Sequence, residues 1–217
     1  MALLRGPSFS PAAGGPPRQL VVLLHGVGAD GHDLIELAPL LARDLPHARF
    51  VAPDGPQPCD MAPYGRQWFS LQKRRPAAML VGLTRTVPLV DAFLDEELRQ
   101  AGLDDRALAL VGFSQGTMMS LHVAPRRSQP CAGVVGFSGA LVGVELLREE
   151  IKSKPPVCLI HGDVDPVVPF SSMQWASDGL TGVGIAVQSH GRPGLPHGID
   201  QEGIAIATRF LKDCFAR

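Results

Sequence analysis

Short apolar runs alternate along this chain with segments in which apolar residues recur every three or four positions. The runs are typical of strands buried on both faces and lie at 20–24, 49–52, 108–111, 133–137, 157–160 and 185–188. Helical periodicity predicts helices around 34–41, 87–101 and 204–215, and shorter helices are expected from about 115 to 124 and at 144–151. This alternation predicts an α/β fold with a mostly parallel central sheet and helices on both of its faces.

The length of the chain bounds its domain organisation. Its 217 residues suffice for one sizeable core and are too few for two comfortable domains. A Pro/Gly-rich leader covers residues 1–19, and we expect residues 20–217 to form a single domain. An irregular stretch at about 53–82 carries several aromatic residues, and such long stretches within compact domains are often functional. No segment remains for a separate cap domain.

Charge and apolar length argue against several classes of protein. Lys and Arg total 20 against 21 Asp and Glu, a formal net charge of −1, so no nucleic-acid partner is expected. Prolines and glycines interrupt the leader, which lacks the apolar segment of a signal peptide, and we expect no stable membrane anchor. Neither a CxxC pair nor a metal-binding Cys/His spacing is present. We therefore expect a cytoplasmic protein without metal or other cofactor.

The first glycine motif follows the first predicted strand. Gly26-Val27-Gly28-Ala29-Asp30-Gly31 has the GxGxxG form of dinucleotide-binding loops, and Asp54 follows the second strand as a candidate ribose ligand. A pyrophosphate needs the N-terminus of the next helix free for it, however, and the carboxylates of Asp30 and Asp33 would repel it there. Asp33 is better explained as an acid that stabilises the first helical turn. A dinucleotide-binding oxidoreductase is therefore the weaker reading of this chain.

The second glycine motif is the stronger signal. Gly112-Phe113-Ser114-Gln115-Gly116 has the GxSxG form and also lies between a predicted strand and a predicted helix. A serine at the tip of such a sharp turn has strained backbone geometry, and glycines on both sides remove collisions with the adjacent elements. The helix that follows directs its N-terminus and the amide of Gln115 at a developing oxyanion. The motif favours Ser114 as the nucleophile of an acyl transfer over a Gly-rich turn that happens to contain serine.

A serine nucleophile needs a histidine base and an acid that orients this base, in the chain order Ser, acid, His. Asp163 and Asp165 compete for the acid after the fifth strand, and His190 and His197 compete for the base after the sixth. Asp165 lies further from its strand, and His197 lies deeper in its loop, between a proline and a glycine. These arguments favour Asp165 and His197 only slightly. The remaining histidines are expected to have structural, turn or surface roles: His25, His32, His47, His122 and His161.

Four motifs in this order resemble the phospholipase/carboxylesterase family, small α/β-hydrolases that include the acyl-protein thioesterases, and most closely its bacterial carboxylesterases. They are HGVG at 25–28, GFSQG at 112–116, HGxxDxxVP at 161–169 and PGLPHG at 193–198. The resemblance implies the α/β-hydrolase fold, Asp165 as the acid and His197 as the base. It also implies that the backbone amides of Val27 and Gln115 bind the oxyanion.

The same resemblance extends to APDGP at 52–56 and to QWF at 67–69, and it implies that Trp68 and Phe69 line the substrate groove. Thr117 is one departure, because many members have a further glycine there. We expect Thr117 to narrow the site beside the nucleophile, so that the family's acyl-chain preference does not carry over to this chain.

These observations predict a serine carboxylesterase that hydrolyses short or linear acyl esters through an acyl-enzyme intermediate. Trp68, Phe69 and Met118 are expected to wall a shallow groove for a small-molecule ester. An acyl-thioesterase or a lysophospholipase on the same triad is the alternative, and the oxidoreductase a distant one. A non-catalytic binding protein on a hydrolase fold would also fit the fold but would usually lack a triad residue. The sequence also allows a homodimer, and it does not determine the oligomeric state.

Overall fold

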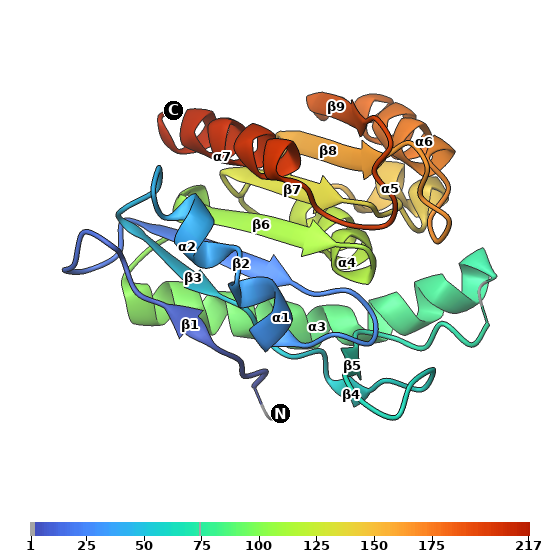
Figure 1. Cartoon of the computed structure of the whole chain (residues 1–217), viewed down its shortest axis with the longest axis horizontal. Helices are drawn as coiled ribbons and strands as arrows, with labels where there is room; N and C mark the ends of the chain where they lie inside the picture. The colour runs from blue at the N-terminus through green and yellow to red at the C-terminus, as the bar shows by residue number, and fades with distance from the viewer. Residues whose placement is uncertain (1–2, 74) are drawn as a thin grey trace.

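A seven-stranded sheet forms the centre of the protein, whose computed structural model describes residues 3–73 and 75–217 (Figure 1). The strands run in the order β1-β3-β2-β6-β7-β8-β9, and every neighbouring pair is parallel except β1 with β3. This confirms the prediction of a mostly parallel sheet. The strands are β1 Ser8–Phe9, β2 Gln19–Leu24, β3 Ala48–Val51, β6 Leu108–Phe113, β7 Gly133–Phe137, β8 Val157–Gly162 and β9 Val187–Arg192, with a separate antiparallel pair of β4 Gln57–Pro58 and β5 Arg66–Gln67.

Helices cover both faces of this sheet (Figure 1). Alternate residues of β2 point to opposite faces: Leu20, Val22 and Leu24 pack in the core with α3, α4 and α6, whereas Val21 and Leu23 pack with α1, α2 and α7. The chain thus has one apolar layer on each side of the sheet. The helices are α1 Gly31–Ile35, α2 Ala38–Leu41, α3 Pro76–Ala101, α4 Gln115–Val123, α5 Val144–Glu150, α6 Ser171–Thr181 and α7 Gln201–Phe215, with 3₁₀ turns η1 Asp105–Ala107 and η2 Ala124–Arg126.

Two boundaries near the N-terminus differ from the sequence prediction. The helix expected around 34–41 is two short helices, α1 and α2. Pro39 lies in the first turn of α2 and has no N–H to donate to the preceding turn, so the hydrogen-bond ladder is interrupted there. Strand β1 lies inside the leader, where the apolar pattern predicts no strand, and it pairs antiparallel with the edge of β3.

Two further boundaries matter for the candidate site. Helix α3 begins at Pro76, inside the stretch predicted to be irregular, with this proline in its first turn. The last strand, expected at 185–188, is β9 at Val187–Arg192. Its register with β8 pairs His190 with Ile160, so His190 is a strand residue and not the first residue of a loop.

Helix α3 is the longest helix, and its length and apolar composition alone would allow it to cross a membrane, which the sequence analysis did not anticipate. The core helices of globular domains can have the same length and apolar composition. In this fold α3 packs against β2 and α4 and buries Leu83, Val90 and Leu94 in the core. Its apolar residues are thereby explained in part by packing within the domain.

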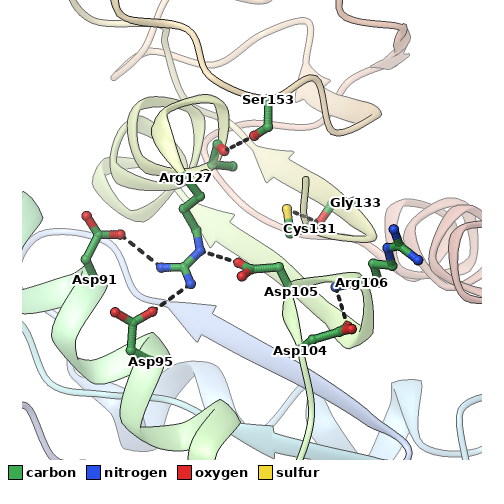
Figure 2. A network of polar contacts seen from close by, with 10 residues as sticks. Asp91, Asp95, Asp104, Asp105, Arg106, Arg127, Cys131, Gly133 and Ser153 are labelled. Carbon is green, nitrogen blue, oxygen red and sulfur yellow. Dashed lines mark hydrogen bonds and ion pairs between the residues drawn. The ribbon is translucent and has the colours of Figure 1, made fainter. Parts of the chain in front are cut away.

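A shared guanidinium fixes α3 to the segment that joins α4 to β7 (Figure 2). Arg127, whose side chain is 8% exposed, lies 3.1 Å from Asp91 and 2.7 Å from Asp95 on α3, and it also pairs with Asp105 in η1. Burial raises the pKa of Asp91, although Arg127 counteracts this effect. One cation therefore pairs with three acids from two separate elements, which ties the long helix to the end of helix α4.

Candidate active site

Ser114 lies between β6 and α4 in a strained backbone conformation. Its φ is +53° and its ψ −112°, and in the described part of the chain only Ser138 is another non-glycine residue with positive φ. The amide of Ser114 donates a hydrogen bond of 2.9 Å to the carbonyl of Phe137 on the neighbouring strand β7. This is the sharp strand-to-helix turn that the GxSxG pattern predicts.

Close backbone contacts explain the glycines of this turn. A Cβ atom on Gly112 would lie 2.4 Å from the amide nitrogen of Thr117, and one on Gly116 would lie 1.7 Å from the carbonyl oxygen of Leu24. A Cβ atom on Gly26 would lie 3.4 Å from the Cβ of Ser114, which shows that the loop after β2 passes directly beside the serine. The motif is therefore required by packing of α4 on β2, and it also brings the two glycine loops together.

We expect Gly116→Ala to lower the free energy of unfolding by about 2 kcal/mol or more, because the added methyl group meets rigid backbone. Thermal unfolding followed by circular dichroism measures this change. Gly198→Ala is the matched control, since a Cβ atom on Gly198 has no neighbour within 4 Å and its φ is not positive. Equal melting temperatures for the two variants would contradict the packing argument.

The loops after β8 and β9 bring Asp165 and His197 together. Asp165 Oδ2 lies 2.7 Å from His197 Nδ1, and its Oδ1 accepts hydrogen bonds from the amides of Val167 at 2.8 Å and Val168 at 2.9 Å. Burial alone would raise the pKa of Asp165, but the hydrogen bonds from His197 and the two amides outweigh it, and the pKa lies below its usual value. The imidazole of His197 is 17% exposed and packs on the ring of Phe113, with centroids 4.9 Å apart. The histidine therefore contacts both the acid and the residue before Ser114.

The competing acid Asp163 and the competing base His190 lie in other surroundings and are not paired with each other. Asp163 is exposed, and its Oδ1 accepts a hydrogen bond of 2.7 Å from the amide of Gly194, which holds the two loops together. His190 lies within β9, and among the described residues its buried Nε2 has no hydrogen-bond partner. Among the two candidate acids and the two candidate bases, Asp165 and His197 are the two that are hydrogen-bonded to each other.

The loop after β2 is held by a neutral histidine. His25 is fully buried; its Nε2 accepts a hydrogen bond of 2.8 Å from the amide of Gly55, and its Nδ1 lies 2.7 Å from the carbonyl oxygen of Gly26. Because Nε2 is the acceptor, the ring proton lies on Nδ1 and is donated to Gly26. Burial lowers the pKa of His25, and the hydrogen bond to Gly26 only partly offsets this. The expected structural role of His25 thus takes a specific form, since it fixes the peptide before Val27.

The side chain of Gln115 braces the same region from the other side. Its Oε1 accepts from the amide of Trp68 at 2.8 Å, and its Nε2 donates to the carbonyl of Phe69 at 2.7 Å. The indole N–H of Trp68 donates to the carbonyl of His25 at 2.8 Å. Among residues 3–73 and 75–217, no group accepts a hydrogen bond from the amides of Val27 or Gln115. Both amides can therefore donate to a ligand oxygen.

Trp68 and Phe69 do not line an open groove, which corrects the expectation from the sequence. Their side chains are 0% and 1% exposed, and both belong to the core cluster beneath the site. Their backbone atoms engage the Gln115 side chain, so the segment supports the turn at Ser114 from within. Met118, one turn into α4, is 7% exposed.

Thr117 does not narrow the space beside the nucleophile, contrary to expectation. It is 1% exposed, and its Oγ1 lies 2.8 Å from the carbonyl oxygens of both Gly112 and Phe137. Its side chain fills the space that Gly136 and Gly139 leave, because a Cβ atom on either glycine would lie within 2.6 Å of Thr117 atoms. The side chain of Thr117 thus points toward β7, and its volume is accommodated because Gly136 on β7 and Gly139 after it have no side chains.

The GxGxxG loop lacks the free helix N-terminus that a pyrophosphate requires. Asp30 Oδ1 accepts from the amides of His32 and Asp33, and Asp54 Oδ1 accepts from the amide of Gly31. These carboxylates cap the five-residue helix α1. Asp30, His32 and Asp54 also offer ligand-type atoms within 4.8 Å of one another, but both acids already serve as acceptors for the backbone. The loop is explained as a capped turn.

Several known proteins resemble this chain in sequence and in structure. A family model described as phospholipase/carboxylesterase matches residues 11–215. The chain is 29% identical over 197 residues to the esterase YpfH of Escherichia coli (91% of this chain, 83% of that protein) and 29% identical over 168 residues to acyl-protein thioesterase 1 of Saccharomyces cerevisiae (71% and 74%). It superposes on the crystal structure of esterase PE8 with a TM-score of 0.94 at 42% identity, covering 98% of this chain and 100% of the other.

Proposed function

Because the chain belongs to the phospholipase/carboxylesterase family, we propose that it hydrolyses carboxylic esters with short or linear acyl groups through an acyl-enzyme intermediate. The protein is a serine hydrolase with the α/β-hydrolase fold, and no separate cap domain is indicated. One observation carries the choice of residues: the hydrogen-bonded pair of Asp165 and His197 packs on Phe113, the residue before Ser114. Ser114 is the proposed nucleophile, His197 the base and Asp165 the acid.

In the proposed reaction, His197 removes the hydroxyl proton of Ser114 while the serine oxygen forms a bond to the ester carbonyl carbon. The amides of Val27 and Gln115 donate hydrogen bonds to the resulting oxyanion. Collapse of this intermediate breaks the bond to the alcohol, which leaves with the proton from His197. Water then attacks the acyl-enzyme by the same sequence and releases the acid. Asp165 holds the imidazole in the tautomer whose Nε2 faces the serine and stabilises the imidazolium.

The proposed acyl site lies beside the first turn of α4. Met118 is one turn beyond Ser114, and its amide donates to the Ser114 carbonyl at 3.2 Å. The loop after β7 also passes beside the nucleophile, because a Cβ atom on Gly139 would lie 3.0 Å from the Ser114 carbonyl oxygen, and the half-buried Leu141 follows in this loop. Without a cap domain, only loops at the edge of the sheet would wall the groove, which suits short or linear acyl groups.

We expect kcat/KM for p-nitrophenyl butyrate to exceed that for p-nitrophenyl pivalate by roughly tenfold or more, because branching beside the carbonyl would crowd a groove formed by close-packed loops. Initial rates on the two esters under the same conditions measure this ratio. Because pivalate esters are intrinsically less reactive, each kcat/KM is divided by the rate constant for base-catalysed hydrolysis of the same ester, and the corrected ratio then reports on the acyl site. Preference for pivalate would contradict the proposed shape of the groove.

Thioester hydrolysis is the second candidate, and the similarity to the yeast acyl-protein thioesterase supports it. Lysophospholipid hydrolysis would use the same residues. Comparing kcat/KM for an oxyester and a thioester with the same acyl group distinguishes ester hydrolysis from thioester hydrolysis, because only the leaving atom differs. A kcat/KM that is much higher for the thioester would make this chain an acyl-thioesterase without changing the proposed triad.

Labelling with a serine-directed fluorophosphonate tests the proposed function directly. We expect one modified peptide, which contains Ser114, and no labelling of Ser114→Ala. The reagent must react with an activated hydroxyl and lose fluoride, and negative charge develops on its phosphoryl oxygen in the transition state, so it tests both the nucleophile and the oxyanion donors. Absence of labelling in the folded protein would contradict the catalytic proposal and favour a non-catalytic binding protein.

A further inference from the structure

His161 lies at the carboxyl end of β8, directly below the loop that carries Asp165. Its side chain is 2% exposed and meets the ring of Phe170 edge-on, with centroids 6.0 Å apart. Its Nε2 lies 3.0 Å from the carbonyl oxygen of Val168 and 3.2 Å from Asp165 Oδ2. The buried imidazole therefore contacts both the candidate acid and the backbone that holds this acid.

The surroundings of His161 fix which of its nitrogens carries a proton. A peptide carbonyl and an ionised carboxylate only accept hydrogen bonds. Nε2 faces one of each, so it must be protonated, since an unprotonated nitrogen would direct its lone pair at two oxygens. His161 is thus a donor that forms its hydrogen bond with the carbonyl of Val168, while its Nε2 also lies against Asp165 Oδ2.

The carboxylate of Asp165 has three hydrogen-bond donors, and the Nε2–H group of His161 lies close to it as a further contact. Its Oδ1 accepts from the amides of Val167 and Val168, and its Oδ2 faces His197 Nδ1 at 2.7 Å and His161 Nε2 at 3.2 Å. These contacts at both oxygens restrict rotation of the carboxylate about its Cβ–Cγ bond. The link from His161 to Val168 also restrains the peptide that binds Oδ1.

We propose that His161 is a positioning residue, whose hydrogen bond to Val168 and close contact with Asp165 keep Asp165 Oδ2 directed at His197. This role rests on the proposed function, because it acts only through Asp165 and touches neither Ser114 nor the ester. Side chains around a catalytic group commonly fix its orientation in this way, and misplacement of the group by about 1 Å can cost about a hundredfold in rate.

Three substitutions separate positioning from packing. In His161→Gln the side-chain amide nitrogen lies near the position of Nε2 and can still donate, whereas in His161→Asn it is too short to reach Asp165. His161→Leu keeps the volume but has no donor. We expect kcat to stay within about threefold of wild type in His161→Gln and to fall by about tenfold to a hundredfold in the other two, with KM little changed. A rescue by Gln over Asn is not expected from loss of packing.

The experiment measures kcat, KM and melting temperature on p-nitrophenyl butyrate, with fluorophosphonate labelling of the wild type. His122→Leu is the control for loss of a buried histidine, because His122 is 3% exposed at the far end of α4, and it should keep the wild-type kcat. Equal kcat in the Gln and Asn variants would overturn the positioning role even if His161→Leu does not fold. If the wild type is labelled at Ser114 but the variants keep full kcat, only this role fails. If Ser114 is not labelled, the proposed function fails as well.

Discussion

Ser114→Ala should remain folded while kcat for ester hydrolysis falls by about 10⁴- to 10⁶-fold. The substitution removes only the Oγ atom of a side chain that is 6% exposed, and it leaves the Cβ atom and the strained backbone unchanged. Without Oγ no acyl-enzyme forms, and the remaining rate comes from the oxyanion donors and from binding alone. Hydrolysis at saturating ester concentration gives kcat, and circular dichroism shows whether the fold is retained.

Ser138→Ala is the control for this experiment. Ser138 is the other described non-glycine residue with positive φ, at +48°, and it is also buried after a parallel strand. It therefore shares the backbone strain and the loss of a hydroxyl but not the proposed chemistry, and we expect its kcat to stay within about tenfold of wild type. Near-normal turnover in Ser114→Ala would remove Ser114 from the mechanism.

The parts of the site that sequence predicts well are those that local backbone packing dictates. The turn can be predicted from the glycines at 112 and 116, because their neighbours leave no room for a side chain and any turn of this shape has the same requirement. The parallel strands can be predicted from the sequence because burial on both faces requires continuously apolar segments. The choice of Asp165 over Asp163 is different. Sequence spacing alone favours it only slightly, and the hydrogen bond to His197 depends on how two loops meet in space.

The failures also have physical causes. The family resemblance implies that Trp68 and Phe69 line the groove, but hydrogen bonds to the Gln115 side chain, which lies 47 positions further along the chain from Trp68, hold their segment against the core. The strand at 185–188 is misplaced because β9 is an edge strand with exposed residues, so its central part carries no apolar signal. The HG pair at 161–162 belongs to the family motif, yet nothing in its pattern indicates that His161 contacts Asp165.

Buried polar side chains, rather than the apolar core alone, determine the arrangement of this site. His25 holds the loop that carries the amide of Val27, and the Gln115 side chain holds the segment at 68–69 against the turn whose amide is the second proposed oxyanion donor. These groups lie away from water with their hydrogen bonds made, so the loops they join are held in one arrangement. The proposed oxyanion donors are thereby oriented before any ester binds, which is what electrostatic stabilisation of the transition state requires.

Asp165→Asn should lower kcat by about 10⁴-fold, the effect expected when the acid that orients a catalytic histidine becomes an amide. Three donors bond to the oxygens of Asp165 and His161 Nε2 lies 3.2 Å from Oδ2, whereas an amide has only one oxygen. The NH₂ group must therefore face either the two loop amides or the side of His197 and His161. The second orientation favours the tautomer of His197 with its proton on Nε2, which cannot accept the proton of Ser114.

Asp163→Asn is the matched control, because it makes the same chemical change two residues away. The amide oxygen of Asn can still accept the hydrogen bond from Gly194, so kcat should stay within about tenfold of wild type. The pKa of Asp165 lies below its usual value, so Asp165 stays ionised at neutral pH and through the usual carboxyl range. Loss of wild-type activity between neutral pH and that range then reflects protonation of a group other than Asp165. A larger loss of kcat in Asp163→Asn than in Asp165→Asn would show that the acid of this site has been assigned to the wrong residue.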